Sequence, residues 1–174
     1  MEKVVLAEEQ RRLLADCRAF VDVINNLSEK QFKQQTNEQW SVADVVQHLY
    51  LSARPVTRLM MGPRDVLRQW GAPATESRTY DEIVATYQKI LTAGAKAPAA
   101  MTPRLEDMDI DKRTIVERFT GVYRALIEAI DNWSAQELDQ YVIPHPALGN
   151  LTVREMLHFT SAHTQHHLRL LPQS

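Results

Sequence analysis

The segment TVREMLHFTSAHTQHHLRLL, from Thr152 to Leu171, opens with the helix-capping pattern Thr-x-x-Glu and carries four of the six histidines of the chain. On an α-helix, side chains four residues apart lie one above the other, so His163 and His167 can direct two imidazoles at one point. The other two histidines point elsewhere. Around the helix axis, His158 lies about 140° from His163, and His166 lies about 100° from His167. Two imidazoles make half of a tetrahedral metal site, but a hydrogen-bonded pair at a helix end is the alternative.

A third candidate ligand lies in an earlier predicted helix. The sequence Ser41-Val-Ala-Asp44 has the form of a capping box and predicts that this helix begins at Ser41. Asp44 can also orient His48, one turn later, but we assign it mainly to the cap. His48 falls on an inward-facing apolar stripe, where an imidazole without a partner would be costly. A hydrogen bond would satisfy it, and a metal ion shared with His163 and His167 would account for all three histidines.

The remaining histidines and the single cysteine are not assigned to the site. His145 lies between two prolines in a predicted loop, Tyr141 to Asn150, from which it can reach the rim of a pocket, although such histidines are more often exposed. We expect His158 and His166 to face solvent or an interface. Cys17 lies within an apolar helical stripe, so we expect it in the core with no chemical role.

Apolar residues recur at helical spacing in four segments besides the histidine-rich one, and the chain is poor in glycine. We predict an all-α fold in which these four helices form a bundle and the histidine-rich helix is added to it. Pro55 is expected to kink or end the second helix. The four predicted bundle helices are Leu6 to Leu27, Ser41 to Met60, Tyr80 to Ala97 and Asp111 to Trp133.

Composition restricts the domain organisation and the partners. The chain has 174 residues and 44% hydrophobic content, which suits one core, so we expect a single domain over residues 1–174. Lys and Arg number 20 against 22 Asp and Glu, with a net charge of −2 and no basic run, so we expect no nucleic-acid partner. No apolar stretch reaches the length of a membrane span, and one cysteine cannot form an internal disulfide. We therefore predict a cytoplasmic protein without membrane contact.

Two segments resemble the DinB-like superfamily of small four-helix-bundle metalloenzymes, which includes the YfiT-like proteins and thiol-dependent transferases. The first is WSVADVVQHL, from Trp40 to Leu49, and the second runs from Pro146 to Leu168 and contains the pattern H-x-x-x-H. The resemblance implies that His48, His163 and His167 bind one divalent metal ion. Many relatives have an acidic residue directly after the first histidine of the pair, whereas this chain has Thr164.

The resemblance also implies a function at such a site. Three neutral imidazoles leave a coordination position open, with zinc or nickel as the expected ion and iron or manganese as alternatives. We expect a small-molecule substrate, transformed by thiol transfer or hydrolysis with a metal-activated nucleophile, and a low-molecular-weight thiol as a possible partner. No general base is identified. The alternative is a non-catalytic metal- or ligand-binding bundle of stress-response type. Because relatives often pair through helices, we also expect a homodimer.

Overall fold

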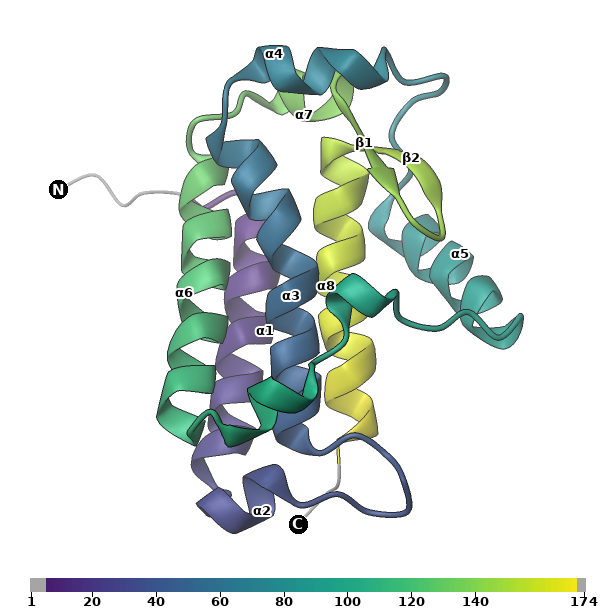
Figure 1. Ribbon diagram of the computed structural model, residues 1–174. Helices are drawn as coiled ribbons and strands as arrows, with labels where there is room; N and C mark the ends of the chain where they lie inside the picture. The colour runs from purple at the N-terminus through teal and green to yellow at the C-terminus, as the bar shows by residue number, and fades with distance from the viewer. Residues whose placement is uncertain (1–5, 172–174) are drawn as a thin grey trace, which may run out of the picture.

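The structure, a computed structural model, describes residues 6–171 and is built around four long helices (Figure 1). Helix α1 packs against α6 and α8, and α3 completes the square by packing against the same two helices. Helices α1 and α8 run in one direction and α3 and α6 in the other (Figure 1). The all-α prediction is confirmed. The four bundle helices are α1 (Glu8–Asn25), α3 (Val42–Met61), α6 (Lys112–Ile130) and α8 (Val153–Leu170).

The predicted membership of the bundle is wrong for two helices. Helix α5 (Tyr80–Thr92) lies outside the bundle and packs against α8, whereas α8 itself, expected as the added helix, is a bundle member (Figure 1). Burial explains why α8 and not α5 belongs to the bundle, because Ile83 is the one fully buried residue of α5. Helix α8, in contrast, has an almost unbroken buried run from Val153 to Thr164. A helix covered on all sides is central to a fold, and one with a single buried position lies at its edge.

Side-chain caps start the helices where the sequence predicts. The hydroxyl of Ser41 accepts a hydrogen bond from the amide of Asp44 at 3.1 Å, and the Asp44 carboxylate accepts one from the Ser41 amide at 3.0 Å. The same reciprocal box begins α8 at Thr152 and Glu155. Asp44 therefore caps α3 and does not orient His48, in agreement with its main assignment.

Pro55 does not end helix α3, which continues through it to Met61. The helix persists because buried residues flank the proline on the side that packs against the bundle, among them Ala53, Val56 and Met60. The lost backbone hydrogen bond lies at an exposed position, where the ring itself is solvent-facing. Packing thus outweighs the local cost of the proline.

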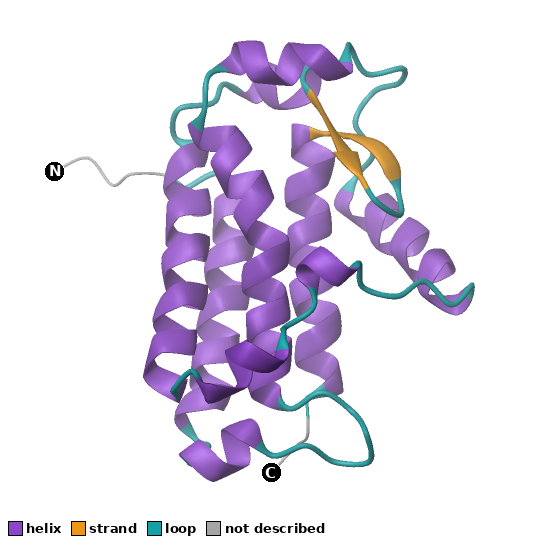
Figure 2. Ribbon diagram, viewed as in Figure 1, coloured by secondary structure: helices purple, strands orange, loops and turns teal. Residues whose placement is uncertain are grey.

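The predicted loop from Tyr141 to Asn150 is a β-hairpin, orange in Figure 2. Its strands are β1 (Val142–His145) and β2 (Gly149–Thr152), antiparallel, with His145 opposite Gly149. Gly149 has a φ of 77°, a value that favours glycine and allows the chain to reverse after Pro146. Of the residues that indicated a loop, Pro146 lies in the turn, Pro144 lies in β1 and Gly149 begins β2.

Short helices connect the long ones (Figure 1). None of the helices in residues 6–171 has both the length and the apolar character needed to cross a membrane. The short helices are α2 (Glu29–Lys33), α4 (Arg64–Leu67), η1 (Arg68–Trp70), η2 (Ala99–Met101), η3 (Leu105–Asp109) and α7 (Ala135–Gln140). Helix α2 covers one end of the bundle, α4 and α7 cover the other, and η2 lies beside α3 (Figure 1).

Candidate metal centre

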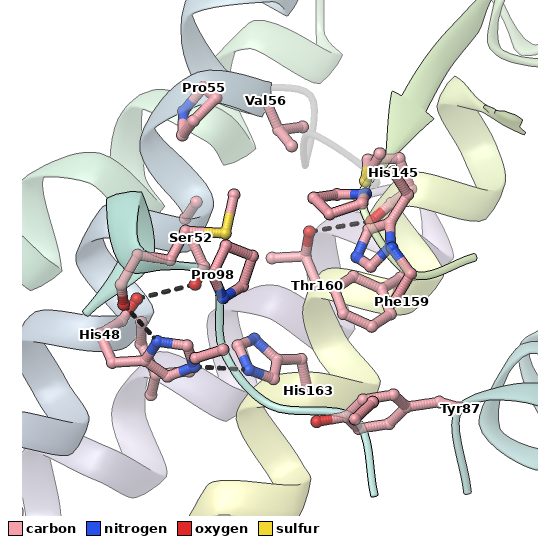
Figure 3. A pocket seen from close by; sticks show the side chains of 18 of the residues that line it. His48, Ser52, Pro55, Val56, Tyr87, Pro98, His145, Phe159, Thr160 and His163 are labelled. Atoms are coloured by element: carbon pink, nitrogen blue, oxygen red, sulfur yellow. Dashed lines mark hydrogen bonds between the residues drawn. The ribbon is translucent and has the colours of Figure 1, made fainter. Parts of the chain in front are cut away.

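The structure brings His48 of α3 together with His163 and His167 of α8 (Figure 3 labels the first two). His48 Nε2 lies 2.9 Å from His163 Nε2, and His167 Nε2 lies 3.2 Å from the same atom. One nitrogen from each ring can be chosen so that all three lie within 4.8 Å of one another. His48 and His163 are buried and His167 is half-buried. The three histidines singled out in the sequence thus form one cluster that could hold a metal ion.

The backbone assigns the tautomer of His48. Its Nδ1 lies 2.6 Å from the carbonyl oxygen of Met101, in η2. A carbonyl oxygen can only accept, so Nδ1 carries the proton and Nε2 of the neutral ring presents a lone pair to His163. A metal-binding histidine commonly donates its second ring nitrogen to a carbonyl in this way, which holds the ring in the orientation that ligation needs.

The distances fit a single ion better than they fit hydrogen bonds alone. The Nε2 atom of His163 faces two other Nε2 atoms, and one proton on it can serve only one of them. A cation, in contrast, accepts a lone pair from each ring. Nitrogens bound tetrahedrally to zinc at about 2.0–2.1 Å lie about 3.3 Å apart, close to the two separations from His163, 2.9 and 3.2 Å, while the full set lies within 4.8 Å. The donor set also suits zinc, nickel and iron.

The electrostatics of the cluster favour neutral rings. Burial, followed by the neighbouring His167 and His48, holds the pKa of His163 well below its usual value. Burial and the proximity of His48 and His166 lower the pKa of His167 to about 3. Burial also lowers the pKa of His48, opposed by its hydrogen bond to Met101. Neutral imidazoles are the metal-binding form, so the site is prepared for a cation at neutral pH.

Aromatic side chains surround the histidine rings. Phe159, one turn before His163, is stacked on it with 5.3 Å between ring centroids and an interplanar angle of 13°. Trp40 contacts the His48 ring at 5.0 Å, and Tyr87 of α5 meets the edge of His163 at 5.9 Å. These contacts cover part of the cluster with aromatic ring surface, and a less polar environment strengthens electrostatic interactions there.

The cluster opens onto a large apolar cavity of about 830 Å³, part of whose wall is drawn in Figure 3. Helices α3, α5 and α8, the η2 segment and the β-hairpin all contribute to its wall. No aspartate or glutamate lines it among the described residues, and Lys96, its one lysine or arginine, is exposed. A cavity of this size with few polar groups is typical of a binding site for a small molecule.

Two of the other histidines differ from their predicted positions, and the third reaches the cavity as the sequence allowed. His158 was expected to face solvent or an interface but is buried, with 7% of its surface exposed. His166 is half-buried against Tyr87 and lines the cavity instead of facing solvent alone. His145 reaches the cavity wall from the hairpin, as the sequence allowed, and is half-buried and not simply exposed. The two differences on α8 arise because other elements, among them α5, cover faces of this helix that periodicity alone leaves open.

Sequence reasoning missed two residues of the site, Met101 and Tyr87. Met101 contributes its backbone carbonyl, which no sequence pattern reveals. Tyr87 belongs to α5, which the sequence predicted to be a bundle helix. The spacing of its apolar residues gives no sign that Tyr87 contacts His163. Thr164, where relatives often have an acid, is fully buried and shares a hydrogen bond with the Tyr123 hydroxyl. It therefore lies in the core and leaves the site without a carboxylate at that position.

The comparison with protein families agrees with this geometry. The family model described as the DinB superfamily matches residues 12–171. The chain therefore belongs to the DinB superfamily, which confirms the resemblance seen in the two histidine-bearing segments. No curated protein and no solved structure gives a significant match.

Proposed function

We propose that this protein is a metal-dependent enzyme that acts on a small apolar molecule, by thiol transfer or hydrolysis. The observation that carries the proposal is that three neutral imidazoles converge at the wall of an apolar cavity large enough for a small-molecule substrate. His48, His163 and His167 would hold a divalent ion, zinc or nickel first and iron or manganese as alternatives. When bound, such an ion would ionise a thiol or a water molecule and so supply a nucleophile at neutral pH.

Other residues of the chain would position the histidine rings or limit the access of water to them. Met101 orients His48 through its carbonyl group, and Phe159 and Trp40 restrict the access of water to the ring cluster. Burial raises the pKa of the Tyr87 hydroxyl to about 12, so this group is protonated at neutral pH and can donate a hydrogen bond beside His163. Since no carboxylate lines the cavity among the described residues, the proposal favours a nucleophile that needs no separate general base.

Metal analysis of protein purified without a histidine tag tests the first half of the proposal. We expect one equivalent of a divalent transition metal in the wild type and its loss in His48→Ala. The matched control is His158→Ala, because His158 lies on α8 but makes no contact with the ring cluster. Wild-type protein that binds no stoichiometric metal after incubation with zinc or nickel would refute the proposal.

A thiol-transfer assay tests the second half. A low-molecular-weight thiol and a halogenated nitroaromatic would give a thioether: the S–C bond forms, the carbon–halogen bond breaks, the halide leaves and the thiol proton passes to buffer. We expect turnover in the metal-loaded wild type and none above background in His48→Ala. Hydrolysis of apolar esters, measured with the same pair of proteins, covers the second reaction class.

A non-catalytic binder of metal or ligand is the second candidate function. The observation that favours it is that no carboxylate lines the cavity among the residues that the structure describes. It predicts stoichiometric metal and ligand binding without turnover of any electrophile, so the same assays separate the two functions.

We also propose that the protein forms a homodimer through its helices. The support comes from the family resemblance, because relatives often pair through helices. Sedimentation at micromolar concentration should give a dimer mass, and a monomer under these conditions would refute this proposal.

A further inference from the structure

The turn of the β-hairpin holds His145 in one tautomer. Its Nδ1 accepts hydrogen bonds from the backbone amides of Ala147 and Leu148, each at 3.0 Å. A protonated Nδ1 would point its own hydrogen at these two donors, so Nδ1 is unprotonated and the proton of the neutral ring is on Nε2. Pro146, which has no amide hydrogen, precedes the two donors and keeps the turn compact. His145 is therefore a hydrogen-bond donor through a single, fixed nitrogen.

The surroundings keep this donor neutral and place it at the cavity. Burial lowers the pKa of His145 to about 4, so the ring carries no charge at neutral pH. Its ring meets that of Phe159 with 4.3 Å between centroids, and Phe159 in turn stacks on His163. Figure 3 shows His145 on the wall of the cavity that faces Ser52 and His48. No residue within 6–171 accepts a hydrogen bond from Nε2 of His145, and this nitrogen is not among the fully buried unpaired atoms, so it is accessible to a molecule in the cavity.

We propose that Nε2 of His145 is a specificity-determining hydrogen-bond donor that binds a carbonyl-type oxygen of an uncharged, largely apolar small molecule in the cavity. The apolar wall accepts the body of such a molecule, and among the described residues the wall has no carboxylate and only the exposed Lys96 to pair with a charged one. A neutral imidazole N–H also polarises the carbonyl group that it binds, without the cost of burying an imidazolium. This inference rests on the cavity being the substrate site of the proposed function.

A matched pair of probes tests it in metal-free protein. Benzophenone and 1,1-diphenylethylene share one skeleton, but the first has a carbonyl oxygen where the second has a methylene group. The quantity to measure is the ratio of their dissociation constants, from quenching of tryptophan fluorescence or from NMR titration. A single hydrogen bond between protein and ligand changes this ratio by about five- to tenfold.

Two variants test the roles of the two ring nitrogens of His145 separately. In His145→Asn the side-chain oxygen can take the place of Nδ1 and keep the turn, but the distal donor is lost. In His145→Gln the amide group reaches the place of Nε2 and restores a donor. We expect the preference for benzophenone to fall about five- to tenfold in His145→Asn and to recover in part in His145→Gln. Unchanged affinity for 1,1-diphenylethylene would show that the cavity is intact.

The outcomes are distinct from those of the metal analysis. Equal preference for the ketone in wild type and His145→Asn would overturn the inference, and so would the failure of both probes to bind the wild type. Nitrogen-15 NMR of the His145 ring gives an independent check: Nδ1 should be unprotonated and Nε2 protonated at neutral pH. The reverse assignment would overturn the inference even where the metal site is present and active.

Discussion

Helix α8 presents two side-chain pairs on opposite sides, each four residues apart and each facing a residue of another helix. On one side His163 and His167 face His48 of α3. On the other side Ser161 and Gln165 face Asp16 of α1, whose carboxylate accepts from them at 2.5 and 3.0 Å. The geometry is the same, but the chemistry differs. The Asp16 cluster pairs two donors with one acceptor, whereas the histidine cluster gathers three groups of the same kind.

This difference separates a structural cluster from a binding site. The Asp16 cluster is complete within the chain, and Tyr80 extends it by donating to Gln165 at 3.1 Å. The histidine cluster cannot satisfy its nitrogens internally and opens onto a cavity. Buried polar groups that satisfy one another stabilise a fold, and an unsatisfied group of several like donors beside a cavity is a candidate site for a ligand. The contrast can be tested by changing one side of α8 at a time.

The largest expected difference is in metal binding. His163→Ala should abolish stoichiometric binding of zinc or nickel, because it removes the central nitrogen of the cluster. Ser161→Ala, a small change on the opposite side of the same helix, should retain one equivalent. Isothermal titration calorimetry of both variants provides the measurement. Loss of metal in both, or in neither, would contradict the division of α8 into two clusters.

The stability of the metal-free protein should fall on acidification. The pKa values of His163 and His167 are lowered in the folded state, that of His167 to about 3, so the unfolded chain binds protons that the folded chain excludes. Their contribution is complete above about pH 6.5 and is lost as the pH falls from there toward the folded values. We expect a loss on the order of a few kcal/mol between neutral pH and about pH 5.

Thermal unfolding followed by circular dichroism at several pH values measures this slope. His163→Ala should flatten it, because one of the buried bases is removed, and saturating zinc should raise the melting temperature most at neutral pH. A melting temperature that rises on acidification from neutral pH would show that the histidines are not buried as neutral bases.

On the other side of α8, Asp16→Ala should destabilise the fold and leave the metal in place. It removes the acceptor for Ser161 and Gln165, and an unsatisfied buried donor costs about 1–3 kcal/mol. Asp16→Asn, which keeps one acceptor oxygen, should cost less. Chemical denaturation of both variants measures the loss of stability, and their zinc content shows whether the metal site is retained. Loss of zinc binding in Asp16→Asn would mean that the two clusters are coupled through α8.

The smallest effect is expected for His158→Leu. The Nδ1 of His158 is buried without a hydrogen-bond partner among the residues described, so an apolar replacement removes an unpaired polar group. Such changes are close to neutral or stabilising, by up to about 1 kcal/mol. A destabilisation of several kcal/mol in urea denaturation would indicate that His158 has a partner that the fold does not reveal.

The starts of the helices and two of the three candidate ligands follow from local spacing. The capping boxes at Ser41 and Thr152 set where α3 and α8 begin, because each box joins residues only three apart. His163 and His167 share a helix face for the same reason, since residues four apart are neighbours on any α-helix. These features depend on the helix alone, so the sequence by itself determined them.

The rest depended on which helices pack together. His48 lies 115 residues before His163, and helical periodicity turned it inward but could not bring it to 2.9 Å from its partner. The order of packing also placed α8 inside the bundle and α5 outside it, which buried His158 and brought Tyr87 to the histidines. The carbonyl group of Met101 is common to every residue type, so no sequence pattern marks it. Tertiary structure alone decided these contacts, because packing energy is summed over the whole core and is not encoded in any single segment.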